Sequence, residues 1–361
     1  MTAVTLFLSF SLNCAAKLEV FSEICNIFAK KMQKKMKIIG IGNALVDILV
    51  LLEDDLVLEG LNLERGGMSL IDDVKHSVIT GMLNELHPAM STGGSAGNTV
   101  LALAQMHTCP GFVGKIGRDN MGRFFSENCS QVGINATLLE GEEATGVANT
   151  FISQDGERTF ATHLGAAATM KAEDVRKEWF EGYDLLYLEG YLVQNHELIE
   201  RVVQTAKAMG LKIAIDLASF TVVRDNLGFM RRLVKEYVDI VFSNEEESAA
   251  FTGGMDADKA LEELAEITEV AVVKLGGKGS SAMCGGKKYA INIDKVEVTD
   301  TTAAGDFYAG GFLYAYSQGA DIETCLRCGS LLASEVVQVV GTRLTDETWE
   351  MIRRKAQTLV G

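Results

Sequence analysis

The sequence predicts a doubly wound α/β fold, and two patterns carry that prediction. From residue 184 onward, continuous apolar and β-branched runs alternate with amphipathic stretches. Such runs are typical of parallel strands in a sheet that helices cover on both faces. Ahead of residue 165, shorter stretches alternate between apolar and polar residues, which indicates antiparallel strands outside the main sheet. Ligands of doubly wound sheets bind beyond the carboxyl ends of the strands.

The elements of the main sheet are expected in a regular order. Buried strands are predicted at residues 184–190, 212–219, 239–244 and 269–276. Helices are predicted between them, from about residue 196 to 209, from about 225, and onward to about 267. A hairpin near residues 281–291 and three helices complete the chain.

Two earlier segments predict a second, small β-sheet. Residues 37–53 show a strand, a glycine turn and another strand, and residues 145–165 alternate on both sides of Asp155-Gly156, a strong hairpin signal. Strands from about residues 44–70 and 140–165 would then form a lid over a ligand site. An ordinary sheet edge is the alternative, and the pattern favours neither.

The first 36 residues differ from the rest of the chain. Their apolar run VTLFLSFSL is too short to cross a bilayer, and the lysines follow it, whereas a signal peptide has its basic residues in front. We expect residues 1–36 to be a disordered extension or a misassigned start, with translation beginning at Met32 or Met36. A secretory signal is the alternative. Residues 37–361 are expected to form one domain.

Charge and cysteine content exclude several classes of function. A net charge of -16 over 361 residues argues against a basic face for nucleic acid or an anionic membrane, although backbone amides can still hold a small anion. The seven cysteines do not form a disulfide framework, and the Cys325–Cys328 pair lacks the further ligands of a metal site. Buried thiols in a reducing, cytoplasmic location are the expectation.

The stretch DTTAAGD, residues 300–306, places small residues directly before a predicted helix. The first amides of a helix lack partners and carry partial positive charge, so Ala303, Ala304, Gly305 and Asp306 could bind an anion through their N–H groups. Asp306 itself has two open interpretations. It either caps the helix, or it acts as the base that takes a proton from a hydroxyl attacking a bound phosphate.

Polar residues follow two other glycine turns. In STGGSAGN, residues 91–98, Gly94 would let a ligand approach the backbone and Asn98 could bind its hydroxyls, with a tight turn as the alternative. Asn43 and Asp47 lie four residues apart at the first glycine turn and could bind vicinal hydroxyls, although both residue types are also common in turns.

Asn244 and Glu247 follow directly on a buried strand and would share one face of a helix. Oxygen ligands of this kind suit Mg²⁺, and the alternative is a capping asparagine beside a solvated acidic turn. The sequence contains no G-x-x-x-x-G-K-[ST] phosphate loop, and GIGNAL (40–45) lacks the third glycine of a dinucleotide fingerprint, which disfavours a dehydrogenase.

Together these stretches resemble the ribokinase or PfkB carbohydrate kinase superfamily, in its adenosine-kinase-like branch. The resemblance rests on GGSAGNTVLALAQM with GKIGRDNMGRFF (114–125), on SNEEE as an N-x-x-E block, and on DTTAAGD as a D-T-x-G-A-G-D block, in the family's order. It covers about residues 37 to 360. It implies a ribokinase-like sheet flanked by helices, with a small β-sheet lid.

The resemblance also implies a role for each matching residue. Asp306 would be the base, and the amides of residues 303–306 would form the anion hole. The remaining roles divide by ligand: Asn43, Asp47, Gly94 and Asn98 for the acceptor, Arg158 over the phosphates, Lys274, Gly276 and Gly279 beside the nucleotide, and Asn244 and Glu247 for Mg²⁺. The implied partners are ATP and a sugar or nucleoside, with Mg²⁺ as cofactor, a monovalent cation as a further candidate, and the homodimer as an assembly open to the chain.

One residue departs from the resembling pattern. Ala303 stands where the second block has its first glycine, and a positive φ there would cost roughly 1 kcal/mol. We expect an ordinary φ at Ala303, so that the alanine is tolerated. The predicted activity is transfer of the ATP γ-phosphate to a hydroxymethyl group of a sugar or an adenosine-like ribonucleoside. A catalytically inactive sugar- or nucleotide-binding sensor is the alternative.

Overall fold

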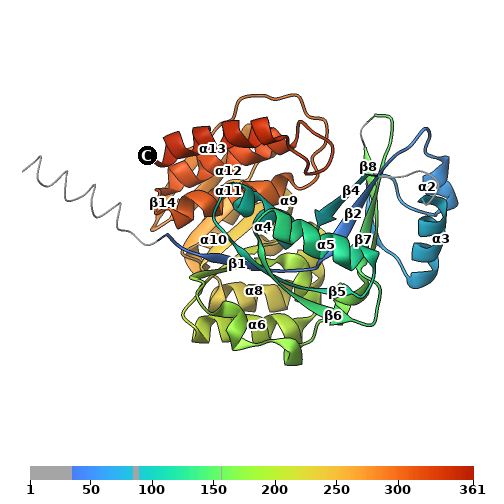
Figure 1. Ribbon diagram of the computed structural model, residues 1–361. Coiled ribbons are helices and arrows are strands. Elements are labelled where there is room, and N and C mark those ends of the chain that lie inside the picture. Colours follow the sequence, from blue (N-terminus) through green and yellow to red (C-terminus); the bar gives the residue numbers. More distant parts are fainter. Residues whose placement is uncertain (1–34, 84–88, 156) are drawn as a thin grey trace, which may run out of the picture. The chain divides into compact units, whose positions relative to one another are not determined.

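The computed structural model describes residues 35–83, 89–155 and 157–361, and Met36–Gly361 forms one compact unit. Residues 1–34 of the expected extension and Gly156 of the predicted hairpin turn lie outside the described residues. No helix in the described ranges is long and apolar enough to cross a membrane. The predicted α/β fold class is confirmed, because a large, mostly parallel sheet lies between two layers of helices (Figure 1).

The main sheet has nine strands. Its strands in spatial order are β14 (Lys287–Ile291), β13 (Ser280–Cys284), β12 (Val270–Lys274), β11 (Ile240–Asn244), β10 (Lys212–Asp216), β9 (Leu185–Glu189), β1 (Ile38–Ile41), β5 (Gly111–Gly117) and β6 (Asn135–Gly141). The strands from β12 to β6 run parallel, and β13 and β14 form the antiparallel hairpin. The carboxyl ends of the parallel strands therefore share one edge, where ligands of such sheets bind.

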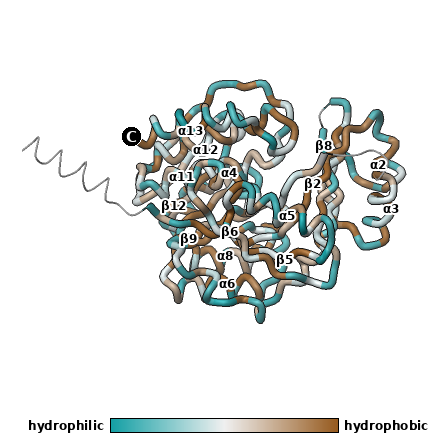
Figure 2. The backbone as a smooth tube through the Cα atoms, in the orientation of Figure 1, coloured by the Kyte–Doolittle hydropathy of each residue, from teal (hydrophilic) through white to brown (hydrophobic). Residues whose placement is uncertain are grey.

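Helices cover both faces of this sheet. In β9, Leu185 and Tyr187 belong to the core beneath α4, α11, α12 and α13, whereas Leu186 and Leu188 belong to the core beneath α6, α8 and α10. Because both faces are buried, the strands are apolar at successive positions. Figure 2 shows hydrophobic segments gathered between the layers and hydrophilic ones in the outer loops.

The described helices follow the strands in chain order. The α-helices are α2 (Leu56–Gly60), α3 (Asp73–Leu83), α4 (Ser95–Gln105), α5 (Asn120–Gln131), α6 (His196–Ala208), α7 (Phe220–Asp225), α8 (Leu227–Tyr237), α9 (Glu245–Thr252), α10 (Ala257–Ile267), α11 (Ala304–Ser317), α12 (Ile322–Val336) and α13 (Asp346–Val360). Short 3-10 helices are η1 (Gly165–Thr169), η2 (Ala172–Asp174), η3 (Lys177–Phe180), η4 (Gly190–Gln194) and η5 (Gly276–Lys278).

A second sheet of five strands forms the small sheet. Its order is β3 (Met68–Leu70), β8 (Arg158–His163), β7 (Gly146–Ile152), β2 (Leu45–Leu51) and β4 (Ala89–Gly93). β7 and β8 pair antiparallel, whereas β2 pairs parallel to β7 and antiparallel to β4. The apolar side chains of Leu58 in α2 and Ile79 in α3 pack in the core that includes Val46 and Ile48 of β2.

Candidate active site

A cavity of about 1010 Å³ lies between the carboxyl edge of the main sheet and the small sheet. Five neighbouring strands of the main sheet each present a polar residue to it at or just past their carboxyl ends: Asn43, Glu189, Asp216, Asn244 and Lys274. The small sheet adds side chains of β2, β3, β7 and β8. The volume lies at the upper end of the range for single small-molecule sites, so the cavity has room for two ligands.

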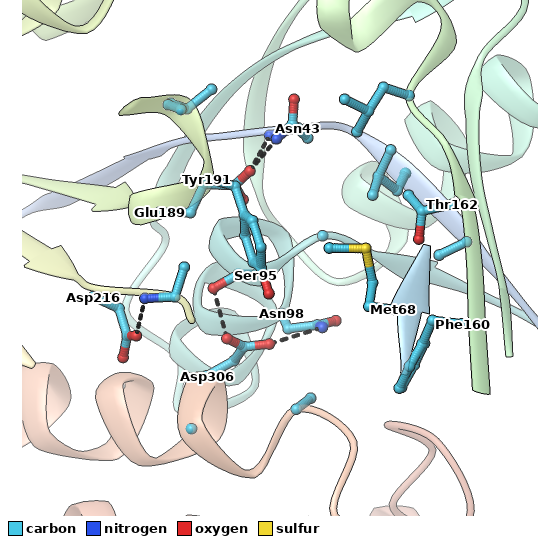
Figure 3. A pocket seen from close by; sticks show the side chains of 18 of the residues that line it. Asn43, Met68, Ser95, Asn98, Phe160, Thr162, Glu189, Tyr191, Asp216 and Asp306 are labelled. Carbon is cyan, nitrogen blue, oxygen red and sulfur yellow. Dashed lines mark hydrogen bonds between the residues drawn. The ribbon is translucent and has the colours of Figure 1, made fainter. Parts of the chain in front are cut away.

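Asp306 lies in the first turn of α11 and faces the start of α4. Its carboxylate accepts hydrogen bonds from Ser95 Oγ at 2.7 Å and from Asn98 Nδ2 at 3.0 Å (Figure 3). Burial raises the pKa of Asp306 to about 6, against the opposing effect of these two donors. Both donors belong to α4, so the carboxylate is not used to cap its own helix.

The amides before and at Asp306 form a concave turn. Ala304 N donates to Thr301 O at 3.2 Å, whereas the N–H groups of Gly305 and Asp306 have no acceptor among the described residues. These two residues line the cavity at the positive end of the helix dipole. The turn can therefore bind an anion through two unpaired amides.

Ala303 adopts a left-handed backbone conformation, with φ 57° and ψ 9°. The expectation of an ordinary φ at this position is wrong. The turn from Asp300 into α11 requires a positive φ, which costs an L-residue roughly 1 kcal/mol or more. Ala303 also lines the cavity, so its methyl group borders the two unpaired amides.

A buried carboxylate organises the neighbouring polar residues. Glu189 accepts hydrogen bonds from Asn43 N at 2.9 Å, from Asn43 Nδ2, and from Ala96 N at 2.9 Å. These bonds join the end of β9 to the turn after β1 and to the first turn of α4. Burial raises the pKa of Glu189 to about 7, although the three donors oppose it.

Asp47 and Gly94 border the same part of the cavity. Asp47 is buried, and burial, followed by the charges of Asp306 and Asp300, raises its pKa to about 7. Gly94 has φ 83°, and a Cβ at Gly94 would lie 2.1 Å from the Asn43 carbonyl oxygen. A larger residue at position 94 would therefore displace the turn that carries Asn43.

Asn244 and Glu247 form a reciprocal capping box at the start of α9. Asn244 Oδ1 accepts from Glu247 N at 2.8 Å, and the Glu247 carboxylate accepts from Asn244 N and Asn244 Nδ2, both at 2.8 Å. Glu247 is buried and lines the cavity, and burial raises its pKa. The asparagine therefore is a cap, but the glutamate is not a solvated turn residue.

Arg158 links the small sheet to the turn before α11. Its guanidinium donates to the side chains of Thr301 and Thr302 and lies 2.9 Å from Asp300 Oδ1. Asp300 is buried and also accepts from Thr302 N at 2.8 Å and Gly341 N at 2.7 Å. Arg158 is thus held over the same turn that carries the unpaired amides.

Comparison with known proteins adds to this geometry. The family model described as pfkB family carbohydrate kinase matches residues 70–349. The chain belongs to the pfkB family of carbohydrate kinases. Among solved structures, a probable sugar kinase from Rhizobium etli is 29% identical, covers 91% of this chain and 100% of its own, and has a TM-score of 0.82.

Two further relatives of the pfkB-family chain represent different activities. The adenosine kinase from Sinorhizobium meliloti is 31% identical over 89% of this chain and 99% of its own, with a TM-score of 0.81. A 5-dehydro-2-deoxygluconokinase from Halalkalibacterium halodurans is 31% identical over 68% of this chain and 79% of its own length. The chain is therefore a kinase of a sugar or nucleoside, and the family implies the use of ATP.

The pfkB-family cavity gathers most of the residues predicted from sequence. The lining includes Asn43, Asp47, Gly94, Asn98, Arg158, Asn244, Glu247, Lys274, Gly276, Ala303, Ala304, Gly305 and Asp306. Gly279 is not part of the lining, and its φ of 97° and its close approach to Ile291 O make it a turn glycine. Its predicted contact with the nucleotide has no support in this geometry.

Sequence reasoning missed three functional side chains that the fold brings to the cavity. Ser95 and Glu189 bind groups already singled out, and Asp216 pairs with Lys274 at 2.6 Å. Glu189 and Asp216 each end a predicted strand, so the rule that ligands bind at the carboxyl edge could have found them. Ser95 carried no signal of its own inside a glycine-rich turn.

The residues near Glu247 fit a magnesium ion held partly by water. Each Glu247 oxygen accepts one hydrogen bond, which leaves a lone pair on each toward the cavity. Mg²⁺ is commonly bound by one or two carboxylates, waters and substrate phosphates. Among the described residues, no group of three or more acidic, histidine or cysteine side chains is arranged to hold a metal alone, and no residue set is assigned to a monovalent cation.

Proposed function

We propose that the chain is an ATP-dependent kinase that transfers the γ-phosphate to a hydroxymethyl group of a ribonucleoside or a sugar. The observation that carries the proposal is the position of Asp306. A buried carboxylate with a raised pKa lies next to the unpaired amides of Gly305 and Asp306. This juxtaposition supplies a base and an anion hole within one helical turn.

The proposed step uses Asp306 as general base. The acceptor O–H gives its proton to the Asp306 carboxylate, and the acceptor oxygen forms a bond to the γ-phosphorus. The bond between that phosphorus and the β–γ bridging oxygen breaks, so ADP leaves. Ser95 and Asn98 hold the carboxylate in place for this transfer. The amides of Gly305 and Asp306 would stabilise charge on the transferred group.

The phosphates are assigned to the half of the cavity near α9 and α11. Asn244 and Glu247 would hold Mg²⁺, which when bound neutralises phosphate charge. Arg158 would lie over the phosphates and hold the small sheet against the turn before α11. We assign the small sheet the role of a lid, because water in an open site would compete with the acceptor. Assembly as a homodimer stays a prediction that sedimentation velocity would check.

An apolar wall favours a nucleoside over a free sugar. The side chains that form it come mainly from the small sheet and the segment after β8: Leu45, Met68, Leu70, Ala148, Phe160, Leu164, Ala167, Met170 and Leu192. Met68 and Leu70 are 45% and 51% exposed, and in Figure 3 Met68 and Phe160 lie beyond Asn98, away from Asp216. A sugar alone would leave these side chains facing water, whereas an attached flat ring would cover them.

Two aromatic residues are candidates for stacking on such a ring. Tyr191 lines the cavity, whereas Phe220 is 46% exposed and lies outside the lining. We therefore assign only Tyr191 to the site. Its hydroxyl is buried among carboxylates, and burial raises its pKa above the ordinary tyrosine value.

A screen of ADP release tests the proposed function. The acceptors are adenosine, inosine, ribose, fructose and phosphorylated sugars, each with ATP and Mg²⁺. We expect turnover with a nucleoside and at least tenfold less with free ribose. Turnover with sugars alone would overturn the nucleoside assignment. Binding by calorimetry with no ADP release from any acceptor would instead identify an inactive sensor.

A further inference from the structure

Lys274 occupies the point where the two halves of the cavity meet. It ends β12, and its Nζ lies 2.6 Å from Asp216 Oδ2 at the end of β10. The same Nζ lies 3.0 Å from the place where a Cβ of Gly305 would be. The ammonium group is therefore in van der Waals contact with the turn that carries the unpaired amides.

Gly305 is required by this contact. A side chain at position 305 would push against the ammonium group, which the bond to Asp216 holds in place. The absence of a side chain lets a cation and two unpaired amides converge on one small volume. Such convergence is what a transferred phosphoryl group needs, because its charge is spread over three oxygens.

The charges of the lining leave few cations for a phosphate. The acidic side chains that line the cavity are Asp47, Glu189, Glu197, Asp216, Glu247 and Asp306, and the lysine and arginine side chains are Arg158 and Lys274. Arg158 already contacts Asp300 and two threonines. Lys274 is therefore the cation of the described lining that lies nearest to both Gly305 and the carboxylates of the phosphate half.

The ammonium group keeps its charge and has donors to spare. Burial opposes the charge, but the carboxylates of Asp216 and Glu247 outweigh it and raise the pKa of Lys274. A lysine ammonium has three N–H donors. Asp216 accepts one, and no other hydrogen bond from Lys274 occurs among the described residues. Two donors are available to an anion in the cavity.

We propose that Lys274 is a catalytic residue that donates to the phosphoryl group during its transfer, and that Asp216 is the positioning residue that holds it there. The inference rests on the proposed kinase function and adds a side-chain contact to the reacting group. Lys274 moves no proton in the step. It stabilises charge on the phosphoryl oxygens together with the amides of Gly305 and Asp306, which is where preorganised donors are most effective.

The test compares Lys274→Met with native protein in two measurements. Loss of one preorganised donor to a transition state lowers kcat roughly 100- to 1000-fold, and we expect a loss of that size with the acceptor KM nearly unchanged. Calorimetry with Mg²⁺ and either ADP or the β,γ-imido analogue of ATP gives a readout without turnover. The variant should bind ADP like native protein and bind the analogue at least tenfold more weakly.

The matched control is Lys207→Met. Lys207 pairs with Asp239 at 2.5 Å before the amino end of β11, so this variant removes a similar ion pair away from the cavity. It should leave kcat and both affinities unchanged. If Lys274→Met also keeps native kcat, or weakens ADP and the analogue equally, the proposed contact with the transferred group is wrong.

A double variant separates the contact from a stranded charge. Lys274→Met leaves the Asp216 carboxylate buried without its cation, which can destabilise the fold. Asp216→Asn with Lys274→Met removes both charges, so the urea midpoint should return toward the native value while kcat stays low. Recovery of native kcat in the double variant would show that only the stranded carboxylate mattered. If native protein turns over no acceptor, the kinase proposal fails, and the two calorimetric affinities still test Lys274.

Discussion

Replacing Ala303 by glycine should stabilise the protein, although glycine usually weakens a helix start. Ala303 has φ 57°, a conformation that costs an L-residue roughly 1–2 kcal/mol. Glycine removes that cost but adds conformational freedom to the unfolded chain, which costs about 0.4–1 kcal/mol. The difference predicts a gain of roughly 0.5–1 kcal/mol in the free energy of unfolding.

Urea unfolding followed by tryptophan fluorescence measures this gain. Two control variants bracket it. Ala304→Gly changes the adjacent alanine, which starts α11 and is not among the positive-φ residues, so it should destabilise the protein by about 0.5–1 kcal/mol. Ala218→Gly changes an alanine with φ 71° and should act like Ala303→Gly. If Ala303→Gly destabilises the protein as Ala304→Gly does, the argument from backbone strain is refuted.

Three further predictions concern the charged groups of the cavity. Ser95→Ala removes a donor that lowers the pKa of Asp306, so the acid limb of the kcat/KM profile, expected near pH 6 where Asp306 loses its charge, should move to higher pH; an unmoved limb would contradict the assignment of Asp306 as base. Asp47 has a folded-state pKa of about 7, above its ordinary value of 3.8, so the folded protein binds the proton more tightly and loses stability as the pH rises from about 4 to 7. Asp47→Asn should therefore be more stable than native protein at pH 8, by on the order of 2 kcal/mol, and equal to it near pH 3, as urea unfolding at both pH values would check. Arg158→Met removes the bonds to Asp300 and the two threonines and should raise the KM for ATP roughly tenfold in steady-state assays, whereas an unchanged KM would place the phosphates elsewhere.

The main sheet could be predicted because its physical signals are local. Each parallel strand is a continuous apolar run, and each run is followed by an amphipathic helix. The polar residues at the strand ends follow from the same pattern. Asn244 stands directly at the end of β11, as expected of a residue at the ligand edge.

Other features depend on contacts that the sequence does not reveal. Glu189 binds the Asn43 turn across 146 residues of sequence, and no local pattern indicates that pairing. The strand β4 joins the small sheet by pairing with β2, although its residues AMSTG carry little strand signal. The φ of Ala303 is set by how the Asp300 turn meets α11, so the residue type at 303 pointed away from the conformation observed.

Asn244 and Glu247 show how two interpretations can both describe one pair. The capping box was the alternative to a metal site, and its hydrogen bonds are present. Those bonds leave one lone pair on each Glu247 oxygen, so the pair can cap α9 and still face a metal ion. The sequence could not separate these roles because both use the same spacing of three residues.

The turnover of Asp306→Asn tests the central claim most directly. Asparagine keeps the size of the side chain but cannot take the acceptor proton. We predict that kcat falls at least 100-fold, in line with the loss of a general base, while the urea midpoint and the affinities for nucleotide and acceptor stay near native values. Turnover within threefold of native protein, with the fold intact, would contradict the assignment of Asp306 as the catalytic base.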